Sequence, residues 1–232
     1  PVASIKPGES VLFETEDANV SLITKETDIW AEFPKLYAMG GGCNPVTGPV
    51  YVEGATNKDC LKVEIKKVVP GFIRNGGYTS IYSGLGSLQN VQGSLQKPLE
   101  PRTKICGFED GTIGDIHGAQ GDGEITGCAL ECQGQVEVKI DVISREEAFY
   151  VDWPQVNTDQ WIGAVACLGY KNLSEAMNTG YTELARRMNK QYGIDELDAY
   201  QLLNLAGKVR VGNASSCICK IDRSILEKYR TK

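Results

Sequence analysis

The sequence is poor in histidine, and this limits the catalytic chemistry open to it. His117 is the only histidine among 232 residues. A Ser-His-Asp or Cys-His arrangement would have to use this one imidazole. No serine or cysteine lies in a nucleophile-elbow sequence, so such a triad would have to be assembled from distant residues.

Runs of basic residues and long apolar segments are also lacking. The chain carries 24 Lys and Arg against 30 Asp and Glu, with no cluster of positive charge, which disfavours binding to nucleic-acid phosphates. The longest apolar runs, such as residues 161–170, are too short to cross a membrane, and we recognise no secretory signal peptide. We therefore expect no nucleic-acid partner, no membrane partner and a cytoplasmic location.

Eight cysteines are present, but their spacing argues against disulfides. On a strand, Cys128 and Cys132 would lie roughly 13 Å apart, too far for a disulfide or one shared metal ion. Cys217 and Cys219 would lie roughly 7 Å apart, at the edge of strained geometry. We expect reduced and mostly buried thiols.

Apolar periodicity predicts short strands in the first part of the chain. Alternating or clustered apolar residues indicate strands within 10–24, 50–53, 60–69 and 136–142. Residues 75–101 are rich in Gly, Ser and Gln and keep no period, so they are predicted to form a long surface loop.

The last third of the sequence changes to helical spacing. One helix is predicted from a cap at Asn172 to a stop at Gly193, and a second from a cap at Asp195 to a stop at Gly207. Residues 208–221 return to a strand pattern.

The stretch "GDIHGAQGDGEITG" (114–127) gathers polar side chains in a glycine-rich segment. Asp115 and His117 stand two apart, so on an extended segment both point to the same side and could bind one ion. Asp17, flanked by apolar strand residues, could supply a third ligand, and Glu124 would remain available as an acid/base. The spacing alone leaves open a solvated turn that binds nothing.

Several segments resemble the formamidase/acetamidase family, which releases ammonia from small amides. "NPVTGPVYVEGATNKDCLKVEI" (44–65) and "GDIHGAQGDGEITGCALE" (114–131) resemble its two signature regions. "IKPGESVLFETEDA" (5–18) is similar to its N-terminal strand pair, and residues 193–213 are similar to its C-terminal region. The resemblance therefore runs along the whole chain.

The resemblance implies a mainly β fold of sandwich or barrel-like sheets, with a smaller α+β C-terminal portion. We expect a β-rich amidase-like core over 1–170 and a helical α+β portion over 171–232, acting as one functional unit. It further implies a bound divalent metal, zinc or calcium, and a homo-oligomer, dimer or higher.

The implied reaction is hydrolysis of a small aliphatic amide, of the formamide or acetamide type, to a carboxylate and ammonia. A metal-bound water would attack the carbonyl, and Glu124 would move the proton to the departing nitrogen. We expect the metal ligands to be Asp17, Asp115 and His117, and the substrate to be oriented by Gln120, Asp122 and Asn44.

The sequence departs from the family in one place. Family members carry a long segment with a Gly-Gly-Asn-(Met)-Asp motif before the Gly-Asp-x-His run, whereas here residues 104–113 pass directly into that run. We therefore expect a family segment to be absent between 113 and 114, either because the chain is a shortened relative or because residues are absent from the chain as given. Two alternatives to the enzyme follow. The chain could be a catalytically silent member that binds a small ligand or metal, or a structural oligomerisation module with residues 75–100 as its interface.

Overall fold

The chain folds into two compact units, Pro1–Ile143 and Ser144–Lys232. Strands β9 (Gln155–Asn157) and β10 (Trp161–Cys167) belong to the second unit because they extend its sheet. The division therefore falls earlier than the boundary after residue 170 expected from the sequence. The computed structural model describes residues 1–29, 43–82, 86–88, 99–109, 112–113, 124–169, 172–213 and 215–230.

The described residues are mostly β, with 38% in strands against 21% in helices. The helices in the described ranges all lie in the second unit. This confirms the prediction of a mainly β fold with a smaller α+β C-terminal portion. The sheets built from the described strands are open rather than closed into a barrel.

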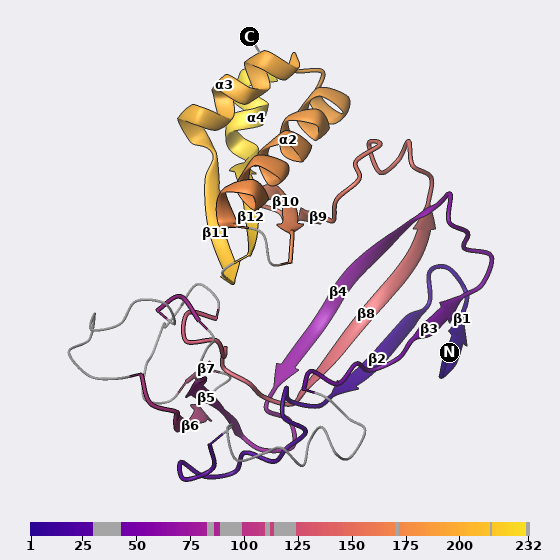
Figure 1. Ribbon diagram of the computed structural model, residues 1–232. Helices are drawn as coiled ribbons and strands as arrows, with labels where there is room; N and C mark the ends of the chain where they lie inside the picture. Colours follow the sequence, from indigo (N-terminus) through magenta and orange to yellow (C-terminus); the bar gives the residue numbers. More distant parts are fainter. Residues whose placement is uncertain are drawn as a thin grey trace. The chain divides into compact units, whose positions relative to one another are not determined.

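The first unit contains a three-stranded antiparallel sheet, with the order β2-β8-β4 (Figure 1). Its strands are β2 (Ser10–Thr15), β4 (Cys60–Pro70) and β8 (Gly134–Ile143). The predicted strands at 60–69 and 136–142 are confirmed. Because β8 begins at Gly134, Cys128 and Cys132 precede it and are not strand partners on one face, as the spacing argument assumed.

A small parallel pair of strands, β1 (Ala3–Ile5) and β3 (Val50–Val52), packs with β8 to form one apolar core of the first unit. Ile5 and Val52 pack with Val138 and Ile140 of β8, and all four side chains are buried.

A second sheet of the first unit has the order β5-β6-β7, with strands Gly76–Ile81, Arg102–Glu109 and Thr112–Ile113. Strand β5 lies inside the stretch predicted to be a loop, so that prediction was wrong for these residues. Tyr78 and Ser80 alternate into the interior, and the low apolar content of the stretch concealed this. Tyr78 and Tyr82 form a small cluster with Ile23 and Cys128.

The second unit places helices against a four-stranded antiparallel sheet of order β11-β12-β10-β9 (Figure 1). The helices α2, α3 and α4 span Leu173–Tyr192, Glu196–Ala206 and Arg223–Arg230, and the remaining strands β11 and β12 span Lys208–Asn213 and Ser216–Asp222. One apolar core joins these elements, with Ile162, Leu184, Met188 and Ile221 fully buried.

The helix boundaries follow the predicted caps. The Asn172 side chain accepts a hydrogen bond from the Glu175 N–H, and Gly193 ends α2 in the left-handed conformation. Asp195 accepts from the first N–H groups of α3, and Gly207 follows its last residue.

All eight cysteines lie in the described ranges, and none forms a disulfide, as predicted.

Of the helices in the described ranges, none has the length and apolar character needed to cross a bilayer.

Candidate active site

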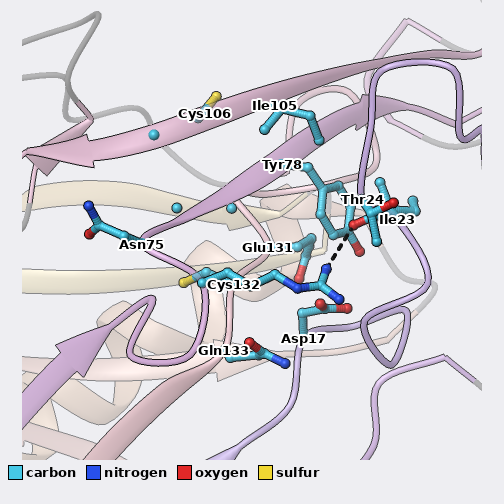
Figure 2. Close-up of a pocket in the computed structure, with 14 residues that line it drawn as sticks. Asp17, Ile23, Thr24, Asn75, Tyr78, Ile105, Cys106, Glu131, Cys132 and Gln133 are labelled. Carbon is cyan, nitrogen blue, oxygen red and sulfur yellow. Dashed lines mark hydrogen bonds between the residues drawn. The ribbon is translucent and has the colours of Figure 1, made fainter.

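A pocket of about 250 Å³ opens in the first unit (Figure 2). It is formed by the loop after β2, by parts of β5 and β6, and by the segment that leads into β8. Its walls consist of Asp17, Ile23, Thr24, Arg74, Asn75, Gly76, Gly77, Tyr78, Ile105, Cys106, Gly107, Glu131, Cys132 and Gln133.

Asp17 is the predicted site residue that lines this pocket, and it is only 4% exposed. It lies beyond the end of β2, in a tight loop, rather than between strand residues as the sequence suggested. Its Oδ1 accepts hydrogen bonds from the backbone N–H groups of Asn19 (2.9 Å) and Ser21 (3.1 Å). The loop therefore fixes the orientation of the carboxylate.

Asn19 connects this loop to β5. Its Nδ2 donates to the hydroxyl oxygens of Tyr78 (2.6 Å) and Tyr82 (2.7 Å), and all three side chains are buried. Burial, together with nearby acidic groups including Asp17, raises the pKa of Tyr78. Both phenols therefore stay neutral at physiological pH and act as fixed hydrogen-bonding groups.

Glu131 is held to β5 by backbone hydrogen bonds. Its N–H donates to the Tyr78 carbonyl (2.8 Å), and its carbonyl accepts from the Tyr78 N–H (3.0 Å). In Figure 2 the side chains of Asp17, Glu131 and Tyr78 lie around one part of the pocket. Burial raises the pKa of Glu131, and the charges of Glu124 and Asp17 raise it further. Such a carboxyl group suits proton exchange.

Gln133 carries an unsatisfied polar atom beside the same pocket. Its Nε2 donates to Glu16 Oε1 (2.7 Å) and to the Ser21 hydroxyl, which fixes the amide orientation. Although Gln133 is only 5% exposed, its buried Oε1 accepts no hydrogen bond from any described group. A buried acceptor without a donor is costly, so a ligand or water with an N–H or O–H group would be stabilised here.

Glu16 supplies the charge that holds Gln133 in place. Burial acts to raise the pKa of Glu16, but hydrogen bonds from Ser21, Gln133 and the Asp17 N–H, with the charge of Arg74, bring it below its usual value. The carboxylate is therefore ionised at neutral pH, which strengthens these hydrogen bonds.

Two of the other predicted site residues, Glu124 and Asn44, lie in the described ranges, and the rest lie outside them. Glu124 is exposed in a turn, close enough to Glu131 to raise its pKa. Asn44 is exposed, and its N–H donates to the Ala18 carbonyl (2.8 Å), so it lies beside the Asp17 loop without lining the pocket. The remaining predictions lie outside the described residues: Asp115, His117, Gln120, Asp122 and the segment proposed to be absent between 113 and 114.

Sequence reasoning missed Asn19, Glu131 and Gln133. Gln133 and Glu16 are 117 positions apart in the chain, so no local spacing could connect them. The available signal was the polar run Glu14–Asp17, which suits a polar network better than a half-buried strand.

The donor chemistry of this wall fits a divalent cation. Carboxylate oxygens are ligands for calcium and for zinc, and Asp17 presents a carboxylate here. Within the described ranges, no group of three or more His, Cys, Asp or Glu side chains could hold an ion. Asp115 and His117, the other two expected ligands, lie outside those ranges.

Comparison with known proteins finds a family match over part of the chain. Residues 109–218 match the model of the Acetamidase/Formamidase family, which confirms the resemblance seen in the sequence. A comparison with curated proteins found no match.

Solved structures of acetamidases share the fold. An acetamidase from Bacillus halodurans is 24% identical, with a TM-score of 0.77 over 98% of this chain and 93% of its own. One from Yersinia enterocolitica is 22% identical, with a TM-score of 0.78 over 97% of this chain and 86% of its own. A predicted acetamidase/formamidase from Thermoanaerobacter tengcongensis is 19% identical, with a TM-score of 0.76 over 100% and 93%.

Proposed function

Starting from the Acetamidase/Formamidase match, we propose that this chain is an amidase that hydrolyses a small aliphatic amide to a carboxylate and ammonia. The acetamidases that share its fold support this assignment. The observation that carries it is the pocket wall, where buried Asp17 and the unsatisfied Oε1 of Gln133 lie together.

The pocket complements a primary amide chemically. The amide NH₂ group has two donors, and Gln133 Oε1 and the Glu131 carboxylate are acceptors on the wall. Ile23 and Ile105 supply apolar surface for the acyl group. This combination of convergent acceptors and an apolar wall is typical of small-molecule sites.

A divalent ion, zinc or calcium, would be held by Asp17 together with Asp115 and His117. When bound, such an ion polarises a carbonyl and lowers the pKa of a coordinated water to roughly 7. The loop around Asp17 supports this role because two backbone N–H groups fix one carboxylate oxygen, which orients the side chain before any ligand arrives.

Glu124 moves the proton in this proposal. Its carboxylate takes a proton from the attacking water and delivers it to the amide nitrogen, which otherwise leaves poorly. The effect of its charge on Glu131 supports its placement near the pocket. Gln120, Asp122 and Asn44 orient the substrate or the groups that hold it.

The test is ammonia release from formamide, acetamide and larger amides, with and without a chelator. Chelation should abolish release. The substitution His117→Ala should remove both metal and turnover, while Glu124→Gln should keep the metal and lower kcat by about 10²–10⁴-fold. If His117→Ala keeps both metal and ammonia release, the assignment is wrong.

A silent family member would give a different result. It would bind metal and show saturable amide binding, yet release no ammonia from any substrate. A structural module would show neither property.

We propose that the protein works in the cytoplasm, which the eight disulfide-free cysteines support.

A further inference from the structure

The loop after β2 contains a strained turn in its backbone. The consecutive residues Val20 and Ser21 both have left-handed backbone, with φ angles of 55° and 59°. This region favours glycine, and a β-branched residue such as valine is a genuine outlier there. Burial of the valine side chain does not offset the strain, because Val20 is 39% exposed. A turn of this kind persists only where surrounding contacts hold it, and such turns cluster at functional sites.

The strained turn brings Ser21 back onto two groups of the pocket. The Ser21 N–H donates to Asp17 Oδ1 (3.1 Å), four residues earlier in the chain. The Ser21 hydroxyl donates to Glu16 Oε1 (2.6 Å) and accepts from Gln133 Nε2. Ser21 therefore helps to fix both the Asp17 carboxylate and the Gln133 amide, and it reaches them because the turn reverses the chain.

Arg74 holds the turn from outside the loop. Its Nη2 donates to the Ser21 carbonyl (2.9 Å), and its Nη1 donates to the Ile23 carbonyl (3.2 Å), the bond that is dashed in Figure 2. The guanidinium carries its donors in a rigid planar fork. The two bonds therefore fix the separation and direction of both carbonyls, at the end of the strained turn.

The segment that carries Arg74 is itself anchored. Arg74 lies in the connection between β4 and β5. The Gly76 N–H donates to the Arg74 carbonyl, and Asn75 Nδ2 donates to the Phe108 carbonyl of β6 (2.9 Å). Arg74 therefore ties the strained turn to the β5-β6-β7 sheet, which forms another part of the pocket wall.

We propose that Arg74 is a positioning residue, which holds the strained turn closed and thereby orients Asp17 and Gln133 in the pocket. The guanidinium acts through the backbone and needs no contact with a substrate. Arg74 lines the pocket, and the amide hydrolysis proposed above assigns it no role. The activity part of the test rests on that proposed function, whereas the structural part does not.

The structural part measures hydrogen exchange of the Ser21 N–H, which Asp17 accepts, in the metal-free chain. Arg74→Ala should accelerate this exchange about tenfold or more, because the turn opens more often. Arg74→Lys keeps the charge but loses the planar fork, so it should accelerate exchange too, and it replaces the alanine variant if that variant does not fold. Arg102→Ala, at an exposed position of β6, is the matched control and should leave the exchange unchanged.

Relief of the strain separates positioning from other roles of Arg74. Glycine adopts left-handed backbone readily, so Val20→Gly should recover most of the protection that Arg74→Ala loses. Val20→Ala keeps the Cβ and with it the strain, so it should recover none. In the assay of ammonia release, Arg74→Ala should lower kcat/KM about 10–100-fold. Val20→Gly should restore most of this loss, and Val20→Ala should not.

Three results overturn the proposal. Wild-type exchange in both Arg74→Ala and Arg74→Lys would show that Arg74 does not hold the turn. Equal recovery by Val20→Gly and Val20→Ala, or recovery by neither, would show that Arg74 does not oppose this strain. A loss of kcat/KM that persists when Val20→Gly has restored the exchange would show that Arg74 acts on the substrate directly. A wild type that releases no ammonia from any amide refutes the proposed function, and the exchange measurements then decide the role of Arg74 alone.

Discussion

The two units of this chain obtain their stability in different ways. The second unit has one apolar core that joins three helices and a sheet, with Leu184, Met188 and Leu226 fully buried. The first unit has two smaller apolar clusters, and much of its buried interior is polar. Asp17, Asn19 and Gln133 are each at most 5% exposed.

This difference separates the unit whose apolar core provides stability from the unit that contains the candidate active site. A continuous apolar core gives stability but no reactive groups. Buried polar side chains are costly unless every group is paired, and they are kept where a site needs them fixed in place. The pocket lies in the unit with the polar interior, so we expect substitutions in the two units to have different consequences.

The largest effect on stability is expected in the second unit. Leu184→Ala leaves a cavity in a fully buried part of the core, so the free energy of unfolding should fall by about 2–5 kcal/mol. Leu205→Ala, at a position that is 81% exposed, is the matched control and should change it by less than about 0.5 kcal/mol. Denaturant unfolding measures both. Equal effects would show that the second unit lacks the core described.

A smaller loss is expected from the polar network of the first unit. Asn19→Ala removes the donor to Tyr78 and Tyr82, which should cost about 1–3 kcal/mol. Tyr82→Phe removes only one of these hydrogen bonds and should cost less. Unfolding curves that leave Asn19→Ala as stable as the wild type would refute the network.

Gln133 should affect substrate binding. Replacing it with Met removes the unsatisfied acceptor, so KM for a hydrolysed amide should rise about three- to tenfold while kcat changes less. Ser21→Ala removes one partner of Nε2 but keeps Oε1 in place, and it serves as the control. If the two variants raise KM equally, Oε1 does not contact the substrate.

The smallest effect concerns the pH dependence of stability in metal-free protein. The pKa of Glu131 is raised above 4.5 in the folded state, so its contribution is fully present below about pH 4.5 and is lost as the pH rises through the folded pKa. Glu131→Gln should therefore stabilise the protein more at pH 7 than at pH 4. Urea unfolding at both values measures this, and an equal change at the two pH values would contradict it.

The elements best predicted from the sequence are those set by local signals. The caps at Asn172 and Asp195 define α2 and α3 because each side chain accepts from N–H groups two or three residues away. Strand β5 was missed because glycine and serine dilute its alternation. Helix α4 was missed because it follows β12 directly, so no loop separates it from the strand pattern of residues 208–221.

The candidate site was only partly predictable for a related reason. Asp17 could be proposed because it lies in a segment, residues 5–18, that resembles the N-terminal strand pair of the family. Glu131 and Gln133 acquire their roles only when the segment before β8 returns beside β5 and the loop after β2. Such a long-range contact leaves no periodic pattern in the sequence.

The most direct test of the account is Asp17→Asn, assayed for ammonia release from acetamide. Asparagine keeps the Oδ1 that accepts from Asn19 and Ser21, and it changes only the second carboxylate oxygen. We expect ammonia release to fall by about 100-fold or more, while the unfolding curve stays close to that of the wild type. A variant that folds normally and hydrolyses acetamide at the wild-type rate would contradict the placement of the active site in this pocket.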